Sequence, residues 1–192
     1  SQFTNNSQVA GGAIYINMAV YADAELNPVS ISSSVFKGNN STGSSGGAIY
    51  AHSDLKITDS TFGGENSADK NSAFGDAGAI RAEAGLVISD SHFENNIAEK
   101  CGGAIGFGKD GSTSTLQITN TMFKNNTAVF NGGAIFTGYN EANREYGTVT
   151  INDSSFIGNV CVNRGAAIFN DAKGTVIINN GVFRDNSAEG SG

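Results

Sequence analysis

The sequence predicts an all-β fold, a right-handed parallel β-helix (solenoid) of about six coils of about 30 residues each. Three recurring elements support this prediction. A phenylalanine returns every 26 to 33 residues, and an asparagine follows it three residues later in every copy but one. A Gly-Gly-Ala-Ile motif comes next, with small substitutions in two copies, and a short alternating apolar run ends five residues before the next phenylalanine. The phenylalanines are Phe3, Phe36, Phe62, Phe93, Phe123, Phe156 and Phe183.

Each repeat unit combines short β-type runs with turns rich in Gly, Asn, Asp and Ser. No run has helical periodicity over the length of a helix, which excludes helical repeats. Strands this short bury an apolar face only when successive coils stack in parallel at about 4.8 Å per coil. We therefore expect residues 1–192 to form a single β-helix domain. Because both ends interrupt a repeat, we expect that domain to be a fragment of a longer surface protein.

The three elements predict three interior columns of side chains. Neighbouring phenylalanine rings in such a column contribute about 1 kcal/mol per pair beyond their burial. The asparagine after each phenylalanine is expected to turn inward, bind backbone groups and form a ladder along the stack. Structural residues expected in these columns include Phe36, Phe93, Phe123, Phe156, Asn96, Asn126, Ile105 and Ile135.

The third coil departs from the pattern. Glu65 stands three residues after Phe62, where the other coils have asparagine. We expect the adjacent Asn66 to restore the ladder. A separate excursion at residues 68–76 is expected to enlarge the same corner of the coil.

Composition and charge exclude several functions. The net charge of −7 argues against binding to the phosphate backbone of nucleic acid, which requires clustered Lys and Arg. No apolar run approaches the roughly 20 residues of a spanning helix, so direct membrane insertion is not expected. Cys101 and Cys161 lie two coils apart in the predicted register, beyond disulfide reach, and are expected to line the interior in reduced form. No cofactor is expected.

One column of acidic residues raises the question of catalysis. Asp59, Asp90 and Asp153 each lie two residues after the isoleucine of the alternating run, and we align them with Ser33, Asn120 and Asn179. Asp or Asn before Ser or Thr caps a tight turn, which is the favoured interpretation. Asp59 and Asp90, on adjacent coils, remain weak candidates for a metal site. We assign no catalytic residue, and expect no enzymatic activity.

The alternative function is that of a β-helical polysaccharide lyase or glycoside hydrolase. Inverting hydrolysis needs two carboxylates about 6.5–9.5 Å apart, and a lyase needs a basic residue beside acidic ligands. The two histidines, His52 and His92, occupy unrelated positions in the coil, and His92 is expected to have a surface or packing role.

The tandem motifs Phe93-Glu94-Asn95-Asn96 with Gly102-Gly103-Ala104-Ile105, and Phe123-Lys124-Asn125-Asn126 with Gly132-Gly133-Ala134-Ile135, resemble the repeats of chlamydial polymorphic outer-membrane proteins. They are also similar to β-helix repeats of other adhesin-like surface proteins. The resemblance implies a cell-surface or secreted location, with display at the outer membrane as the passenger of an autotransporter. It further implies adhesion, with a host-cell receptor or a glycan as partner.

Binding is expected in the insertions, since repeat cores are uniform and loops vary. The chain takes 8 residues from the Gly-Gly-Ala-Ile isoleucine to the next strand isoleucine in two coils, but 17, 13 and 16 in the first, fourth and fifth. These insertions should leave at one corner, and aromatic and polar side chains in them are typical of interface anchors. The candidate binding residues are Tyr139, Asn140, Arg144, Tyr146 and Tyr21.

Overall fold

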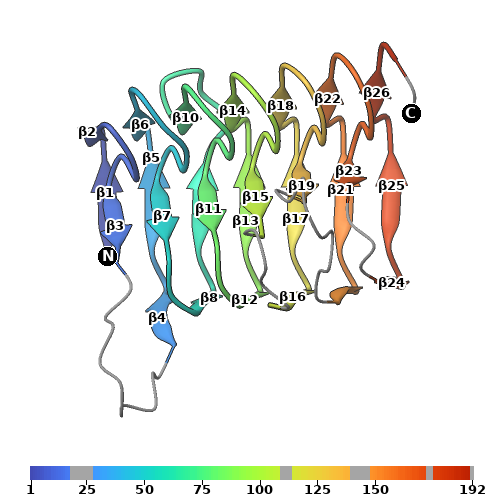
Figure 1. Cartoon of the computed structure of the whole chain (residues 1–192), viewed down its shortest axis with the longest axis horizontal. Coiled ribbons are helices and arrows are strands. Elements are labelled where there is room, and N and C mark those ends of the chain that lie inside the picture. Colours follow the sequence, from blue (N-terminus) through green and yellow to red (C-terminus); the bar gives the residue numbers. More distant parts are fainter. Residues whose placement is uncertain (18–27, 109–113, 139–147, 172–174, 191–192) are drawn as a thin grey trace.

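The computed structural model describes residues 1–17, 28–108, 114–138, 148–171 and 175–190. It confirms the predicted right-handed parallel β-helix, and the described residues form no helix. The coils stack side by side along the long axis of the molecule (Figure 1). Each full coil contributes one strand to each of four parallel sheets, which contain seven, seven, six and six strands.

The first sheet, called here the Phe sheet, carries the repeated phenylalanines. Its strands are β1 (Gln2–Thr4), β5 (Val35–Lys37), β9 (Thr61–Gly63), β13 (His92–Glu94), β17 (Met122–Lys124), β21 (Ser155–Ile157) and β25 (Val182–Arg184). The corner sheet follows, built from two-residue strands. They are β2 (Ser7–Gln8), β6 (Asn40–Ser41), β10 (Ser72–Ala73), β14 (Ile97–Ala98), β18 (Thr127–Ala128), β22 (Val160–Cys161) and β26 (Ser187–Ala188).

The other two sheets carry the remaining motifs. The Gly-Gly sheet consists of β3 (Ile14–Ile16), β7 (Ile49–Ala51), β11 (Ile80–Ala82), β15 (Ile105–Phe107), β19 (Ile135–Thr137) and β23 (Ile168–Asn170). The Leu/Ile sheet consists of β4 (Val29–Ser32), β8 (Leu55–Thr58), β12 (Leu86–Ser89), β16 (Leu116–Thr119), β20 (Val149–Asn152) and β24 (Val176–Asn179).

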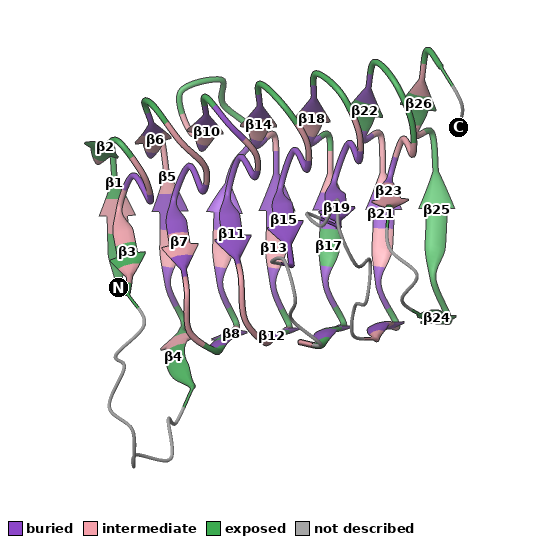
Figure 2. Ribbon diagram, in the orientation of Figure 1, coloured by how far each residue is buried: buried purple, intermediate pink, exposed green. Residues whose placement is uncertain are grey.

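Parallel pairing places the same motif position of neighbouring coils opposite itself. Phe93 pairs with Phe62 on one side and with Phe123 on the other, and Ile105 pairs with Ile80 and Ile135. All six neighbouring pairs in the phenylalanine column stack nearly parallel, with ring centroids 4.6 to 4.9 Å apart. The coil spacing sets this distance, so each of the five rings from Phe36 to Phe156 is packed on both faces. The central coils are buried along most of their inward positions (Figure 2).

The asparagine ladder runs through the corner after the Phe sheet. In the fourth coil, Asn96 Nδ2 donates to Asn126 Oδ1 at 2.9 Å and to the carbonyl oxygen of Phe62 at 3.0 Å. The backbone N–H of Asn96 also donates to Asn126 Oδ1, at 3.1 Å. This arrangement satisfies buried amide and carbonyl groups at a bend where no strand partner is available. The ladder consists of Asn6, Asn39, Asn71, Asn96, Asn126, Asn159 and Asn186.

The structure contradicts two predictions about the third coil, namely Asn66 as its ladder residue and the excursion at residues 68–76. The ladder passes through Asn71, not Asn66: Asn71 Nδ2 donates to Asn96 Oδ1 at 2.9 Å and to the carbonyl oxygen of Phe36 at 2.9 Å. The extra residues lie at 64–70, between the Phe sheet and the ladder, rather than at 68–76. The chain makes a detour there and then rejoins the register at β10, which pairs regularly with β6 and β14.

The backbone of this corner favours glycine at both positions of the Gly-Gly pair. The first glycine has a positive φ, 67° at both Gly102 and Gly132. Ala77 occupies the same position with φ 64°, a conformation that costs an L-residue about 1–2 kcal/mol. At the second position, a Cβ added to Gly103 would lie 2.1 Å from the carbonyl oxygen of Gly133. The coils therefore approach too closely at this point for a side chain.

The two cysteines are free in the structure. Cys161 is buried in the corner sheet, where it pairs with Ala128. Cys101 is only half-buried, which corrects its expected interior position, because it precedes the corner glycine instead of lying on a strand. Burial raises the pKa of the Cys101 thiol to about 11, so this thiol is protonated at neutral pH.

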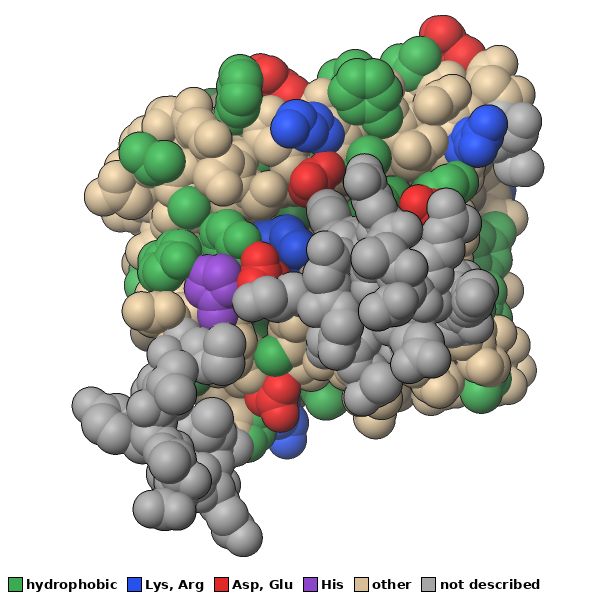
Figure 3. All heavy atoms as spheres, in the orientation of Figure 1, with side chains coloured by type: hydrophobic (Ala, Val, Ile, Leu, Met, Phe, Trp, Pro, Cys, Tyr) green, Lys and Arg blue, Asp and Glu red, His purple; other side chains and the backbone are tan. Residues whose placement is uncertain are grey.

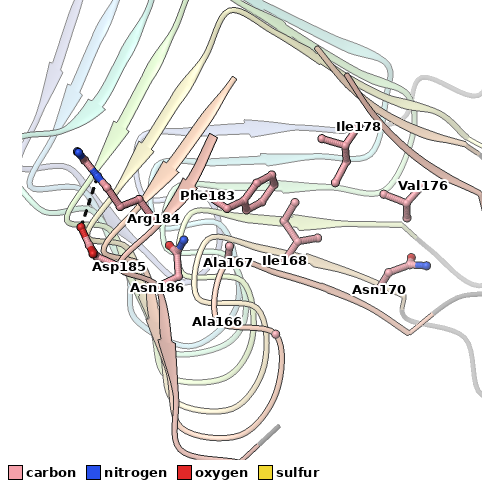
Figure 4. Close-up of a pocket in the computed structure, with 11 residues that line it drawn as sticks. Ala166, Ala167, Ile168, Asn170, Val176, Ile178, Phe183, Arg184, Asp185 and Asn186 are labelled. Atoms are coloured by element: carbon pink, nitrogen blue, oxygen red, sulfur yellow. Dashed lines mark ion pairs between the residues drawn. The ribbon is translucent and has the colours of Figure 1, made fainter. Parts of the chain in front are cut away.

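The last coil leaves the interior columns uncovered. A pocket of about 580 Å³ is lined by residues that include Ile168, Ile178 and Phe183. Figure 4 shows these side chains in the pocket. The equivalent side chains of the preceding coils are buried. Phe183 is 44% exposed, whereas Phe156, one coil earlier, is fully buried. The pocket is thus the open end of the hydrophobic core.

Candidate interaction surface on the Gly-Gly sheet

The Gly-Gly sheet carries four insertions at one edge. They lie between β3 and β4, β15 and β16, β19 and β20, and β23 and β24, so all leave the same edge of this sheet (Figure 1). This common departure point was predicted from the repeat spacing. The five candidate binding residues within the insertions lie outside the described residues, and their role stays a prediction: Tyr139, Asn140, Arg144, Tyr146 and Tyr21.

Two outward columns run across the sheet beside these insertions. The middle residue of each strand points outward, because its neighbours on both sides point into the core. The residue after each strand forms the second column. The first contains Tyr15, Tyr50, Arg81, Gly106, Phe136 and Phe169, and the second includes His52, Glu83 and Gly108.

Tyr15, His52 and Glu83 form a chain of hydrogen bonds across three coils. Tyr15 Oη lies 2.8 Å from His52 Nε2, and His52 Nδ1 lies 2.7 Å from Glu83 Oε2. Because the carboxylate can only accept when ionised, the proton of a neutral His52 belongs on Nδ1, and Tyr15 then donates to Nε2. The imidazole therefore connects a half-exposed phenol to a largely buried carboxylate.

Tyr50 and Arg81 complete this outer cluster, which is defined here as Tyr15, Tyr50, His52, Arg81 and Glu83. Tyr50 Oη donates to Glu83 Oε1 at 2.6 Å, and its ring stacks on His52 with centroids 4.7 Å apart. Arg81 Nη2 lies 3.7 Å from Glu83 Oε1. Arg81 Nη1 donates to the carbonyl oxygens of Ala82 and Gly106, at 3.0 and 3.3 Å. Gly106, which has no side chain, leaves room for the guanidinium.

These contacts set the ionisation of the cluster. Burial alone would raise the pKa of Glu83, but hydrogen bonds from Tyr50 and His52, with the charge of Arg81, outweigh it and lower that pKa. Burial and the hydrogen bond to Glu83 raise the pKa of Tyr50 to about 12. The cluster therefore holds a carboxylate and a protonated phenol at neutral pH. Figure 3 views this face, where histidine, acidic and basic side chains gather over β7 and β11.

This cluster was not predicted from the sequence. Its signal was present, because Tyr15 and Tyr50 both follow the isoleucine of the Gly-Gly-Ala-Ile motif and so share a column. His52 and Glu83 occupy the second column, which lies outside the repeated motifs. His92 lies on the Phe sheet, with Nε2 3.8 Å from Glu94 Oε2, separate from the cluster.

The acidic column near the Leu/Ile sheet consists of turn residues. Asp59, Asp90 and Asp153 have φ of 48°, 50° and 49°, the left-handed region typical of Asp and Asn at turns. Asn120 Nδ2 donates to Asp90 Oδ1 at 2.7 Å, and Ser33 Oγ donates to Asp59 Oδ2 at 2.8 Å. The equivalent residue of the last full coil is Asn180, not Asn179, because Asn179 still belongs to β24, opposite Asn152.

Neither a metal cluster nor a spanning helix is found in the part of the chain that the structure describes. Within those residues, no three His, Cys, Asp or Glu side chains are grouped so that they could hold a metal ion. Asp59 and Asp90 accept hydrogen bonds from Ser33 and Asn120, and their role as metal ligands stays a prediction. No helix among the same residues is long and apolar enough to cross a membrane.

Three segments of the chain match the family model described as the Chlamydia polymorphic membrane protein repeat: residues 33–52, 90–107 and 120–138. The chain carries repeats of this kind. The segments cover the second, fourth and fifth coils, each from the turn before the Phe sheet to the Gly-Gly sheet. Neither a curated protein nor a solved structure matches the chain. The polymorphic membrane protein repeat and the β-helix are compatible with an adhesin-like surface protein.

Proposed function

We propose that this chain is an adhesive segment of a surface-displayed protein, such as an autotransporter passenger, which attaches to a host-cell receptor or a glycan. The observation that carries the proposal is that four of the insertions and the outer cluster lie together. The interior columns repeat in every coil, whereas these four insertions and the outer cluster belong to the Gly-Gly sheet and its edge. Repeat proteins use such variable, exposed surfaces for binding.

The polymorphic membrane protein repeat supports the same assignment. That family is one of non-enzymatic surface proteins, which favours attachment over catalysis and a location at the outer membrane or cell surface. The buried phenylalanines and isoleucines of the motifs cannot contact a partner. They support binding indirectly, because they hold the coils that present the outer surface.

The test is attachment of the purified 192-residue chain to cultured epithelial cells. In one variant, residues 139–147 are replaced by a short turn, which leaves β19 intact. In a control variant, the insertion at residues 109–113 is shortened in the same way, which leaves β15 intact. We expect the first change to reduce cell binding at least about tenfold, equivalent to about 1.4 kcal/mol, and the second to reduce it less.

Unchanged binding by the first variant would contradict a role for that insertion. Absence of binding by the unmodified chain, or depolymerisation of a polysaccharide by it, would overturn the adhesive function as a whole. Circular dichroism and thermal unfolding establish that each variant keeps the β-helix, since both changes lie outside the repeated columns.

A further inference from the structure

We propose that the corner of the third coil binds a neutral oligosaccharide, in two grooves that flank the insertion at residues 64–70. The inference rests on the proposed function in that it names a ligand class for an adhesive module. It places this ligand away from the Gly-Gly sheet, at the junction of the Phe sheet and the corner sheet.

The insertion is a local addition that the scaffold does not need. The ladder asparagine follows the phenylalanine after three residues in the other coils, but after nine in the third, from Phe62 to Asn71. The ladder nevertheless continues without a gap, from Asn39 through Asn71 to Asn96. The extra residues thus have no role in closing the core.

Hydrogen bonds hold the insertion against the neighbouring coils on both sides. Lys37 Nζ of the second coil lies 3.0 Å from Asp69 Oδ2. Asn95 Nδ2 of the fourth coil donates to the carbonyl oxygen of Gly64 at 2.8 Å. The insertion therefore forms an ordered ridge on the surface, and this order reduces the entropy cost of binding a ligand beside it.

A groove lies on each side of this ridge. The first, of about 400 Å³, is lined by residues that include Asn40, Thr42, Ser72, Phe74 and Glu99. The second, of about 290 Å³, is lined by residues that include Glu65, Ser67, Asn95, Asn125 and Thr127. Lys70 and Ile97 line both grooves, so the two grooves lie next to each other. Together they have room for a linear ligand of more than one ring, because ligand sites start at roughly 300 Å³.

The lining of the first groove matches the surface of a sugar ring. A pyranose has an apolar C–H face, which packs on an aromatic ring, and a rim of hydroxyls, which pair with amides and hydroxyls. Phe74 is 54% exposed and supplies such a ring. Beside it, Ser72 Oγ donates to Asn40 Oδ1 at 3.0 Å, which fixes the orientation of the amide. The Asn95, Asn125 and Thr127 side chains supply similar polar groups in the second groove.

The charges in the grooves favour a neutral ligand. Lys70 is the shared cation, with Glu99 in one groove and Glu65 in the other, and the whole chain has a net charge of −7. A sulfated or sialylated glycan would meet net repulsion there. Within the described residues, neither Lys70 nor Glu99 forms an ion pair, so both charged groups can bind sugar hydroxyls.

The experiment uses saturation-transfer NMR and calorimetry on the whole 192-residue chain. The probes are two neutral tetrasaccharides, cellotetraose and chitotetraose, and a heparin tetrasaccharide of similar length. We expect at least one neutral probe to bind and the heparin probe not to bind. Phe74→Ala should weaken the neutral interaction about tenfold, which corresponds to about 1.4 kcal/mol.

Phe130→Ala is the matched control, because Phe130 is similarly exposed, at 50%, on the corner of the fifth coil, where no ridge is present. It should leave sugar binding unchanged. The inference is overturned if neither neutral probe binds, if heparin binds more tightly, or if Phe74→Ala and Phe130→Ala have equal effects.

Cell attachment separates this inference from the proposed function. If the chain attaches to cells but binds neither neutral probe, the oligosaccharide site is wrong and the adhesive function stands. If a neutral probe binds through Phe74 but cells are not bound, the site stands and the adhesive function fails.

Discussion

The phenylalanine column and the outer cluster of the Gly-Gly sheet are built from the same coils by different rules. In the column, one residue type repeats at one position, and each ring lies 4.6 to 4.9 Å from the next. In the outer cluster, Tyr15, His52 and Glu83 are three different residue types, and each bond joins one coil to the next. Each coil adds one more stacked ring to the column, so its stabilisation accumulates along the stack. The outer cluster occurs once, and its hydrogen bonds form only when all its members are present.

The largest loss of stability is expected when a ring is removed from the phenylalanine column. Phe123→Ala is expected to lower the free energy of unfolding by about 3–5 kcal/mol, because the buried ring leaves a cavity between two stacked neighbours. Phe130→Ala, which removes a half-exposed ring from the same coil, should change it by less than about 1 kcal/mol. Urea denaturation measures both. Equal effects of the two changes would contradict the division between column and surface.

The asparagine ladder gives a sharper test, because Asn66 was expected in the third coil of the ladder and Asn71 occupies that place. Asn71→Ala should cost about 2–3 kcal/mol, since it leaves buried backbone groups without partners on both sides. Asn66→Ala should cost less than about 0.5 kcal/mol, because its side chain bonds only Asp69 on the surface, at 3.2 Å. Thermal unfolding of the two variants compares them directly. A larger loss for Asn66→Ala would place the ladder in the insertion after all.

The smallest effect is expected in the outer cluster. Glu83→Gln should cost about 1 kcal/mol at neutral pH, because it weakens the charge-assisted bonds from Tyr50 and His52. The folded protein lowers the pKa of Glu83 below its usual 4.5. Its stabilising contribution is therefore full above that value and is lost as the pH falls through the lowered pKa.

The difference between Glu83→Gln and the unmodified chain should accordingly shrink as the pH falls below 4.5 and through the lowered pKa of Glu83. Denaturation curves recorded between pH 3 and pH 7 test this expectation. A difference that grows on acidification would mean that the carboxylate is not held ionised by Tyr50 and His52.

The sequence by itself determined the β-helix, its parallel register and the residues of its core. It could do so because the coil is the repeat: Phe93 and Phe123 are 30 residues apart in the chain and adjacent in space, so periodicity in sequence is contact in structure. The same spacing predicted that the insertions leave at one edge. The corner glycines followed from the same pattern, because a close approach of coils recurs wherever the motif does.

Only the tertiary structure decided where the repeat is broken and what lies on its outside. The residue three positions after Phe62 is Glu65, but Asn71 makes the hydrogen bonds of the ladder. The ladder position is defined by contact with the neighbouring coils and not by the number of residues after the phenylalanine. His52 and Glu83 lie 31 residues apart, which is one repeat, but their position in the coil carries no repeated residue type, so no motif marks them as partners. Inward positions repeat because every coil meets the same neighbours, while outward positions are free to differ, and their contacts must be observed.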